Sequence, residues 1–163
     1  MLKRLFIVQF FLLSSLLVTA CGFQPLHGYN DGSSVNLSQV TIPEQLDRTG
    51  QLIRNEILQL SRTSGKSAIY RLIFTKKENE TSLIVRSNTG INRKSFQLSV
   101  DYTLVRISDG KVVHKGTTFS NVAFDRSSTP FADYQARIDA TERAAKEVGY
   151  DIRTRVSAYL KTS

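Results

Sequence analysis

The sequence has few residues of the types that build disulfides, metal centres and common active sites. Its only cysteine is Cys21, so no intramolecular disulfide can form. Its two histidines, His27 and His114, lie far apart in the chain without neighbouring metal-ligand residues, and no glycine-rich phosphate loop is present. No nucleophile with its base, pair of carboxylates or Cys/His cluster can be recognised. We therefore expect a protein that is not an enzyme and binds no metal or cofactor, with His114 on a strand surface.

The length and charge indicate one basic domain. A chain of 163 residues with 40% hydrophobic residues can form one ordinary core. Its formal charge is +8, which falls to about +6 when Lys3 and Arg4 are removed with a signal peptide. A basic surface suits a phosphorylated lipid, a membrane surface or nucleic acid, and charge alone does not choose among them. Export argues against nucleic acid, and Phe119, Phe124 and Phe131 are interpreted as core residues.

The first 20 residues have the pattern of a cleavable signal peptide. Lys3 and Arg4 precede an apolar run over residues 5–18, and small residues follow it. The run is shorter than the roughly 20 apolar residues that cross a bilayer, so a permanent transmembrane helix is the weaker interpretation.

The residues around the cleavage site predict lipidation. Leu17-Val18-Thr19-Ala20-Cys21 resembles the bacterial lipobox, in which the cysteine thiol takes up a diacylglyceryl group. Stable anchoring needs more than one acyl chain, which a lipidated N-terminal cysteine has. Because Gly22 stands where an inner-membrane retention aspartate would be, we expect sorting to the outer membrane. The predicted organisation is a signal peptide over residues 1–20, a lipidated N-terminus and tether over 21–36, and one domain over 37–163.

The mature part begins with a short strand and a helix. Residues 38–42 are predicted to form a strand that ends at Pro43, which fits the first turn of a helix. The helix is expected to end at Ser64-Gly65. Glycine inside a helix destabilises it by about 1 kcal/mol relative to alanine, so the helix is expected to start nearer Gly50 than Pro43. Its apolar side is predicted from four residues at helical spacing: Leu46, Ile53, Ile57 and Leu60.

Strands and hairpin loops are predicted next. The strands cover residues 67–76, 81–87, 94–107 and 111–124, joined by hairpin loops at 76–80, 87–90 and 108–111. Asp109-Gly110 favours a type I′ turn. The clearest strand signal is a period-two alternation of apolar with polar residues, which predicts one buried and one solvent-exposed face. The apolar residues are Phe96, Leu98, Val100, Tyr102 and Leu104.

A long helix is predicted to follow. Ser127-Ser128-Thr129-Pro130 supplies an N-cap and a first-turn proline for a helix that ends near Lys161. Asp139 with Arg143 and Glu142 with Lys146 form predicted i,i+4 pairs. An apolar stripe is predicted along it, made of Tyr134, Ile138, Thr141, Ala145, Val148, Ile152, Val156 and Tyr159. The expected fold class is α+β, an antiparallel sheet of four to five strands with two helices packed on one face.

The lipobox, the element order and three short segments resemble the LPS-assembly lipoprotein LptE family in its alphaproteobacterial form. These segments are Cys21-Gly22-Phe23-Gln24-Pro25-Leu26, Gly50-Gln51-Leu52-Ile53-Arg54-Asn55, and Ile152-Arg153-Thr154-Arg155-Val156 with Tyr159-Leu160. The resemblance covers nearly the whole mature chain, although His27 stands where the family has a tyrosine. It implies a plug inside the LptD β-barrel that assists barrel assembly and lipopolysaccharide insertion, without catalysis.

Candidate contacts for lipopolysaccharide are Arg86, Arg93 and Lys94, which flank the predicted turn at residues 87–90. A solvated basic hairpin end without a ligand is the alternative interpretation. At the level of the whole protein, the alternatives are a free-standing periplasm-facing lipoprotein that binds an anionic ligand, and a lipoprotein hydrolase, for which the sequence offers no catalytic residues.

Overall fold

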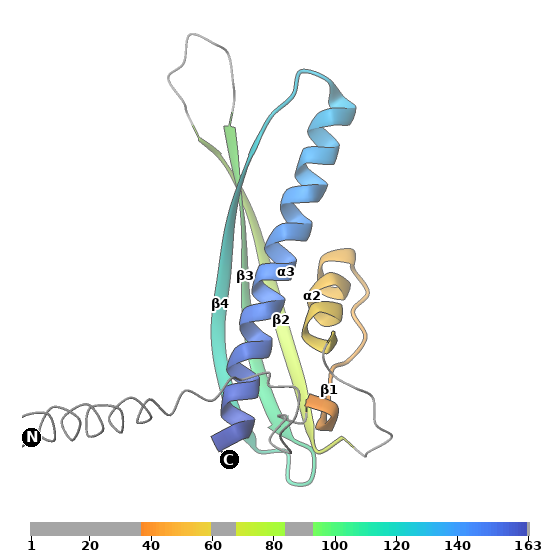
Figure 1. Ribbon diagram of the computed structural model, residues 1–163, viewed down its shortest axis with the longest axis vertical. Helices are drawn as coiled ribbons and strands as arrows, with labels where there is room; N and C mark the ends of the chain where they lie inside the picture. Colours follow the sequence, from red (N-terminus) through yellow and green to blue (C-terminus); the bar gives the residue numbers. More distant parts are fainter. Residues whose placement is uncertain (1–36, 60–67, 84–92, 163) are drawn as a thin grey trace, which may run out of the picture. The chain divides into compact units, whose positions relative to one another are not determined.

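The structure, a computed structural model, describes residues 37–59, 68–83 and 93–162 (Figure 1). All of them belong to one compact unit, Val35–Ser163. The signal peptide, Cys21, the tether, Arg86 and the predicted turn at 87–90 lie outside the described residues, and those predictions stay predictions. The element order is a 3-10 turn η2 (Leu37–Gln39), β1 (Val40–Thr41), α2 (Arg48–Leu58), β2 (Tyr70–Leu83), β3 (Arg93–Arg106), β4 (Val112–Asp125) and α3 (Pro130–Thr162).

The expected α+β class is confirmed, with one four-stranded sheet and two helices. The strands lie in the order β1-β2-β3-β4, and the three long strands pair antiparallel. The two-residue β1 pairs parallel to the start of β2, which makes the sheet mixed. Both helices lie on one face of the sheet, with α2 beside the middle of α3 (Figure 1).

The predicted loop at residues 76–80 is wrong, because β2 runs without interruption through it. The charged residues that suggested a loop find partners in the fold. Lys76 binds Asp47 at 3.1 Å and Glu78 at 2.7 Å, and Glu80 pairs with Lys94 on the neighbouring strand. A strand can therefore extend beyond the apolar core when its inward charges are neutralised.

The predicted type I′ turn at residues 108–111 is also wrong. Such a turn needs a positive φ at two residues, and among the described residues only Gly110 has one, at 69°. The Gly110 amide donates to the Arg106 carbonyl at 2.9 Å, and the Arg106 amide donates to the Lys111 carbonyl at 2.9 Å. The connection is thus a longer hairpin loop closed by one left-handed glycine.

The first helix begins close to Gly50, as expected, and ends earlier than predicted. Asp47 is its N-cap and accepts a hydrogen bond from the Gly50 amide at 2.9 Å, which confirms a start near Gly50. Leu46 precedes the cap and is fully exposed, so its predicted place on the apolar side is wrong. The helix ends at Leu58, where the carbonyl of Glu56 accepts a hydrogen bond from Arg153 of α3 at 2.9 Å in place of a further helical turn.

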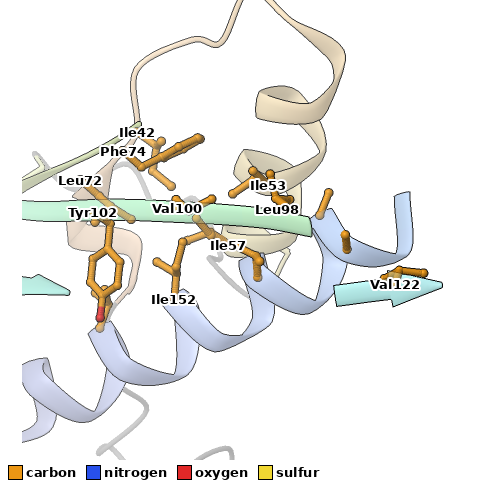
Figure 2. Close-up of a cluster of buried hydrophobic side chains, with 14 of the residues drawn as sticks. Ile42, Ile53, Ile57, Leu72, Phe74, Leu98, Val100, Tyr102, Val122 and Ile152 are labelled. Atoms are coloured by element: carbon orange, nitrogen blue, oxygen red, sulfur yellow. The ribbon is translucent and has the colours of Figure 1, made fainter. Parts of the chain in front are cut away.

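The core lies between the inner face of the sheet and the two helices. The alternation predicted for β3 is confirmed, since all five of its apolar residues are buried. Figure 2 shows several of the side chains that meet there. They include Leu72 and Phe74 of β2, Leu98, Val100 and Tyr102 of β3, Ile53 and Ile57 of α2, and Ile152 of α3.

Small and polar residues let α3 approach β4 closely. Ala140, Ala144 and Ala145 are completely buried in α3. On β4, the buried hydroxyls of Thr118 and Ser120 donate to carboxylates of α3. A buried hydroxyl requires such an acceptor, so this interface is held by hydrogen bonds as well as by apolar contact.

Thr118 donates to Asp151 at 2.5 Å, and Ser120 donates to Glu147 at 2.6 Å. The predicted surface pair of Asp139 with Arg143 is present at 2.9 Å. Glu142, however, binds Arg48 of α2 at 2.5 Å rather than Lys146. An acid on α3 therefore connects to the start of α2, which periodicity within one helix could not reveal.

Two of the three phenylalanines predicted as core are exposed. Phe124 is buried as expected, but Phe119 is 63% exposed and Phe131 is 72% exposed. Phe119 occupies an outward position of β4. Phe131 and the 59% exposed Tyr134 lie in the first turns of α3, before its first buried residue, Ala140. The predicted apolar stripe therefore begins later in α3.

Candidate functional surfaces

The structure describes two of the three residues predicted to contact lipopolysaccharide, and it places them on opposite faces of β3. Arg93 points outward and lies 3.4 Å from Asp125 of β4. Lys94 points inward and forms an ion pair with Glu80 of β2. Consecutive strand residues point to opposite sides, so these two cations do not converge. Each is already paired with an acid, and lipopolysaccharide contact by Arg86, Arg93 and Lys94 stays a prediction.

The sheet face opposite the helices, here called the uncovered face, is not packed against any described element. Its middle consists of four cross-strand rows of outward residues. Only Lys77 and Asp101 among them are charged, and the others are chiefly hydroxyl and amide side chains. The rows are Thr75–Asp101–Thr117, Lys77–Ser99–Phe119, Asn79–Gln97–Asn121 and Thr81–Ser95–Ala123.

The middle of the uncovered face is ordered by its own contacts and carries one large apolar side chain, while Ile73 and Leu83 of β2 are exposed nearer its two ends. The Thr117 hydroxyl donates to the Asp101 carboxylate across the strands at 2.6 Å, so this carboxylate already has a hydrogen-bond partner. Phe119 stands between the polar rows with most of its ring in solvent. A mainly polar surface with one exposed aromatic ring at its middle suits contact with another polar protein surface through an aromatic anchor.

A second feature is a groove between the end of α3 and the start of β4, here called the C-terminal groove. It has a volume of about 480 Å³ and is widely open to solvent. Its β4 side is formed by His114, Lys115 and Gly116, and Tyr102 of β3 lies at its base. Ala158, Tyr159 and Thr162 of α3, together with Arg155, form the other side.

Aromatic contacts shape this groove. The rings of His114 and Tyr159 stack with centroids 5.0 Å apart, and Tyr102 Oη lies 3.3 Å from His114 Nε2. A Cβ at Gly116 would lie 2.6 Å from Tyr102 Oη, so only glycine leaves room for the phenol. The expectation that His114 is a surface residue is wrong in part, because it is half-buried between two tyrosines. Glycine within a strand marks such close approaches, and Gly116 was the signal that sequence reasoning missed.

Arg155 connects the groove to the backbone of β4. Its guanidinium donates a hydrogen bond to Asp151 at 3.0 Å, lies 2.9 Å from the same carboxylate in an ion pair, and donates to the Thr117 carbonyl at 3.2 Å. The hydrogen-bonded carboxylate of Asp151 raises the pKa of Arg155 above its ordinary value. Burial raises the pKa of the Tyr102 phenol, while the nearby Arg155 charge opposes that shift. The groove therefore combines a neutral phenol with a permanently charged guanidinium.

Two kinds of feature are absent from residues 37–59, 68–83 and 93–162. No group of three or more His, Cys, Asp or Glu side chains there is arranged to hold a metal ion. No helix in this part of the chain is long and apolar enough to span a membrane.

Comparison with solved structures relates this fold to bacterial lipoproteins. A protein of Caulobacter crescentus assigned as a lipoprotein is 28% identical, with a TM-score of 0.65, over 81% of this chain and 98% of its own. The rare lipoprotein B of Shewanella oneidensis has a TM-score of 0.54 at 10% identity, over 73% of this chain and 92% of its own. The minor lipoprotein of Acinetobacter baumannii has a TM-score of 0.52 at 11% identity, over 73% of this chain and 90% of its own.

The last two likenesses show the fold alone, since their identities are so low. No family model and no curated protein sequence matches the chain. The chain thus shares its fold with bacterial lipoproteins, in agreement with the lipoprotein part of the family resemblance.

Proposed function

We propose that this protein is an outer-membrane lipoprotein, anchored through lipids on Cys21, that occupies the lumen of an LptD-like β-barrel. In this role it assists assembly of the barrel and helps lipopolysaccharide reach the outer leaflet, and it catalyses no reaction. The shared fold with bacterial lipoproteins and the lipobox ending at Cys21 support the anchored part of the proposal.

The composition of the uncovered face is the main support for a β-barrel partner. The lumen of a wide outer-membrane barrel is polar, whereas its outside is apolar. A contact surface made chiefly of hydroxyl and amide groups matches such a wall, because these groups exchange water for protein hydrogen bonds without the desolvation cost of buried charges. Phe119 then serves as the aromatic anchor in the middle of that surface.

The first experiment is affinity purification of the tagged full-length chain from its native envelope in mild detergent, followed by mass spectrometry. We expect one large β-barrel protein in about equal amount. A Cys21→Ala version measured beside it should lose membrane anchoring and yield less barrel. Recovery of the lipoprotein alone would contradict the proposal and favour a free-standing binding protein.

A second experiment tests which surface meets the barrel. Asn121→Arg places a charge on the uncovered face, and Phe119→Asp removes its aromatic anchor. Each should lower barrel recovery about tenfold, the effect of losing a contact that contributes about 1.4 kcal/mol. Gln135→Arg, the same kind of change at an exposed position of α3, is the matched control. Equal recovery from all three variants would show that the uncovered face is not the contact.

Lipopolysaccharide contact is tested separately by charge reversal at Arg86, Arg93 and Lys94. Because Arg93 and Lys94 already have acidic partners, the ligand would need to displace Asp125 or Glu80. Binding of purified lipopolysaccharide should weaken in the triple variant. Unchanged binding would assign these residues to the solvated end of the hairpin.

A further inference from the structure

The C-terminal groove has features of a ligand site that the proposed barrel contact does not use. Its walls are mainly apolar, being formed by the stacked rings of His114 and Tyr159 with Ala158 beside them. Its volume of about 480 Å³ falls in the usual range of small-molecule sites, roughly 300–1,000 Å³. Lys115 occupies an outward position of β4, so the groove lies at the open edge of this last strand and borders the uncovered face.

The charge at the groove is positive and incompletely neutralised. Lys115 lies on its edge and forms no ion pair with any residue that the structure describes. Arg155 shares the carboxylate of Asp151 and donates once to the Thr117 carbonyl. A guanidinium has five donors; Asp151 and the Thr117 carbonyl engage three of them and Tyr102 interacts with the group as well, so at most two donors remain for a ligand anion. An anion bound between Lys115 and Arg155 would therefore meet one unpaired cation and the remaining donors of a guanidinium that Asp151 holds in place.

The shape selects the rest of the ligand. A small anion would leave the apolar walls in water, and a neutral chain would leave Lys115 without a counter-charge. The groove is widely open to solvent, so it can hold one chain of a molecule whose remaining parts stay outside. A glycerophospholipid with a net negative charge has that chemistry, with one phosphate next to each pair of acyl chains.

We infer that the C-terminal groove binds one acyl chain of an anionic glycerophospholipid along Tyr102, Ala158 and Tyr159, with the lipid phosphate between Lys115 and Arg155. This inference does not depend on the barrel partner. It assigns to the end of α3 a lipid contact separate from the acyl chains expected on Cys21.

The test is photo-crosslinking of the full-length protein in maltoside micelles. The probe is phosphatidylglycerol with a diazirine on one acyl chain, and phosphatidylcholine with the same chain is the comparison lipid. After illumination, mass spectrometry identifies the labelled peptides. We expect labelling by phosphatidylglycerol on the peptides that contain residues 113–116 and 155–162, with much weaker labelling by the zwitterionic lipid.

Three variants separate a specific site from general adhesion. Lys115→Glu should require roughly tenfold more lipid for half-maximal labelling, as expected for loss of one charge-assisted contact. Ala158→Trp fills the groove and should abolish labelling, while Lys146→Glu, an exposed lysine elsewhere on α3, should leave it unchanged.

Because Ala158 is exposed, the tryptophan variant should fold, and circular dichroism checks this. Thr162→Trp is a second groove-filling change at an exposed position. Equal labelling by both lipids, labelling that survives both tryptophan variants, or displacement of the probe by inorganic phosphate alone would each overturn the inference.

Discussion

Arg153 joins the two helices, and its removal provides the sharpest test of the packing described above. Its side chain is 5% exposed and reaches from α3 to the last turn of α2. Nη1 donates to the Glu56 carbonyl at 2.9 Å and lies 3.2 Å from the Glu56 carboxylate. The guanidinium also lies 5.0 Å from the ring centroid of Tyr150. A cation at this place also compensates the negative end of the α2 dipole.

We predict that Arg153→Ala lowers the free energy of unfolding by about 3 kcal/mol. A hydrogen bond to a charged group contributes roughly 1.5–3 kcal/mol, and a cation–π contact about 0.5–1 kcal/mol. The substitution also leaves the largely buried Glu56 carboxylate without its partner, and breaking such a pair costs about 3–5 kcal/mol in buried sites. Because Glu56 keeps some solvent contact, the lower end of that range applies.

The assay is urea unfolding followed by far-UV circular dichroism. Arg143→Ala is the matched control, since its ion pair with Asp139 is exposed on the same helix and should cost at most about 0.5 kcal/mol. A double variant, Arg153→Met with Glu56→Gln, should recover much of the loss because it removes both charges together. A cost for Arg153→Ala no larger than that of the control would refute the reasoning.

Three further changes test local features, each by urea unfolding. Asp47→Ala should lower the free energy of unfolding by about 1 kcal/mol, because it removes the N-cap of α2. Burial alone would raise the pKa of Asp47, but hydrogen bonds from Gly50 and Lys76 lower this pKa overall. The stabilising contribution of Asp47 should therefore be present at neutral pH and disappear as the pH falls through the lowered pKa. An unchanged cost at pH values below it would contradict this. Gly149→Ala should destabilise by about 1–3 kcal/mol although alanine favours helices, because its Cβ would lie 2.7 Å from Glu56 Cβ; any gain in stability would show that the helices separate freely. Gly110→Ala should cost about 1 kcal/mol from its positive φ alone, since nothing lies within 4 Å of the added methyl group, and a neutral result would show that the loop adopts another turn.

The sequence by itself determined those features in which neighbouring residues decide the outcome. The strict alternation from Phe96 to Leu104 requires a strand with one buried face, because successive side chains point to opposite sides. Pro130 can begin a helix without losing a hydrogen bond, and the 33-residue α3 begins there as predicted. The lipobox at Cys21 is likewise a local pattern and needed no fold to be recognised.

Only the tertiary structure decided which charged residues find partners. The segment of residues 76–80 has the composition of a loop, yet it continues β2 because Lys76 and Glu80 meet Asp47 and Lys94 from other elements. For the same reason, Arg93 and Lys94 are adjacent in sequence but lie on opposite faces of the sheet. Distances between residues far apart in the chain cannot be obtained from spacing along it.

The candidate sites depend on the tertiary structure even more strongly. Phe119 is apolar and was expected in the core, but its register on β4 turns it to the face that no helix covers. The C-terminal groove combines Tyr102, residues 114–116 and the last turns of α3, which only the packing of a long helix across an antiparallel sheet brings together. Local patterns thus determined most of the elements and predicted the lipid anchor, whereas long-range packing determined which surfaces remain available to a partner.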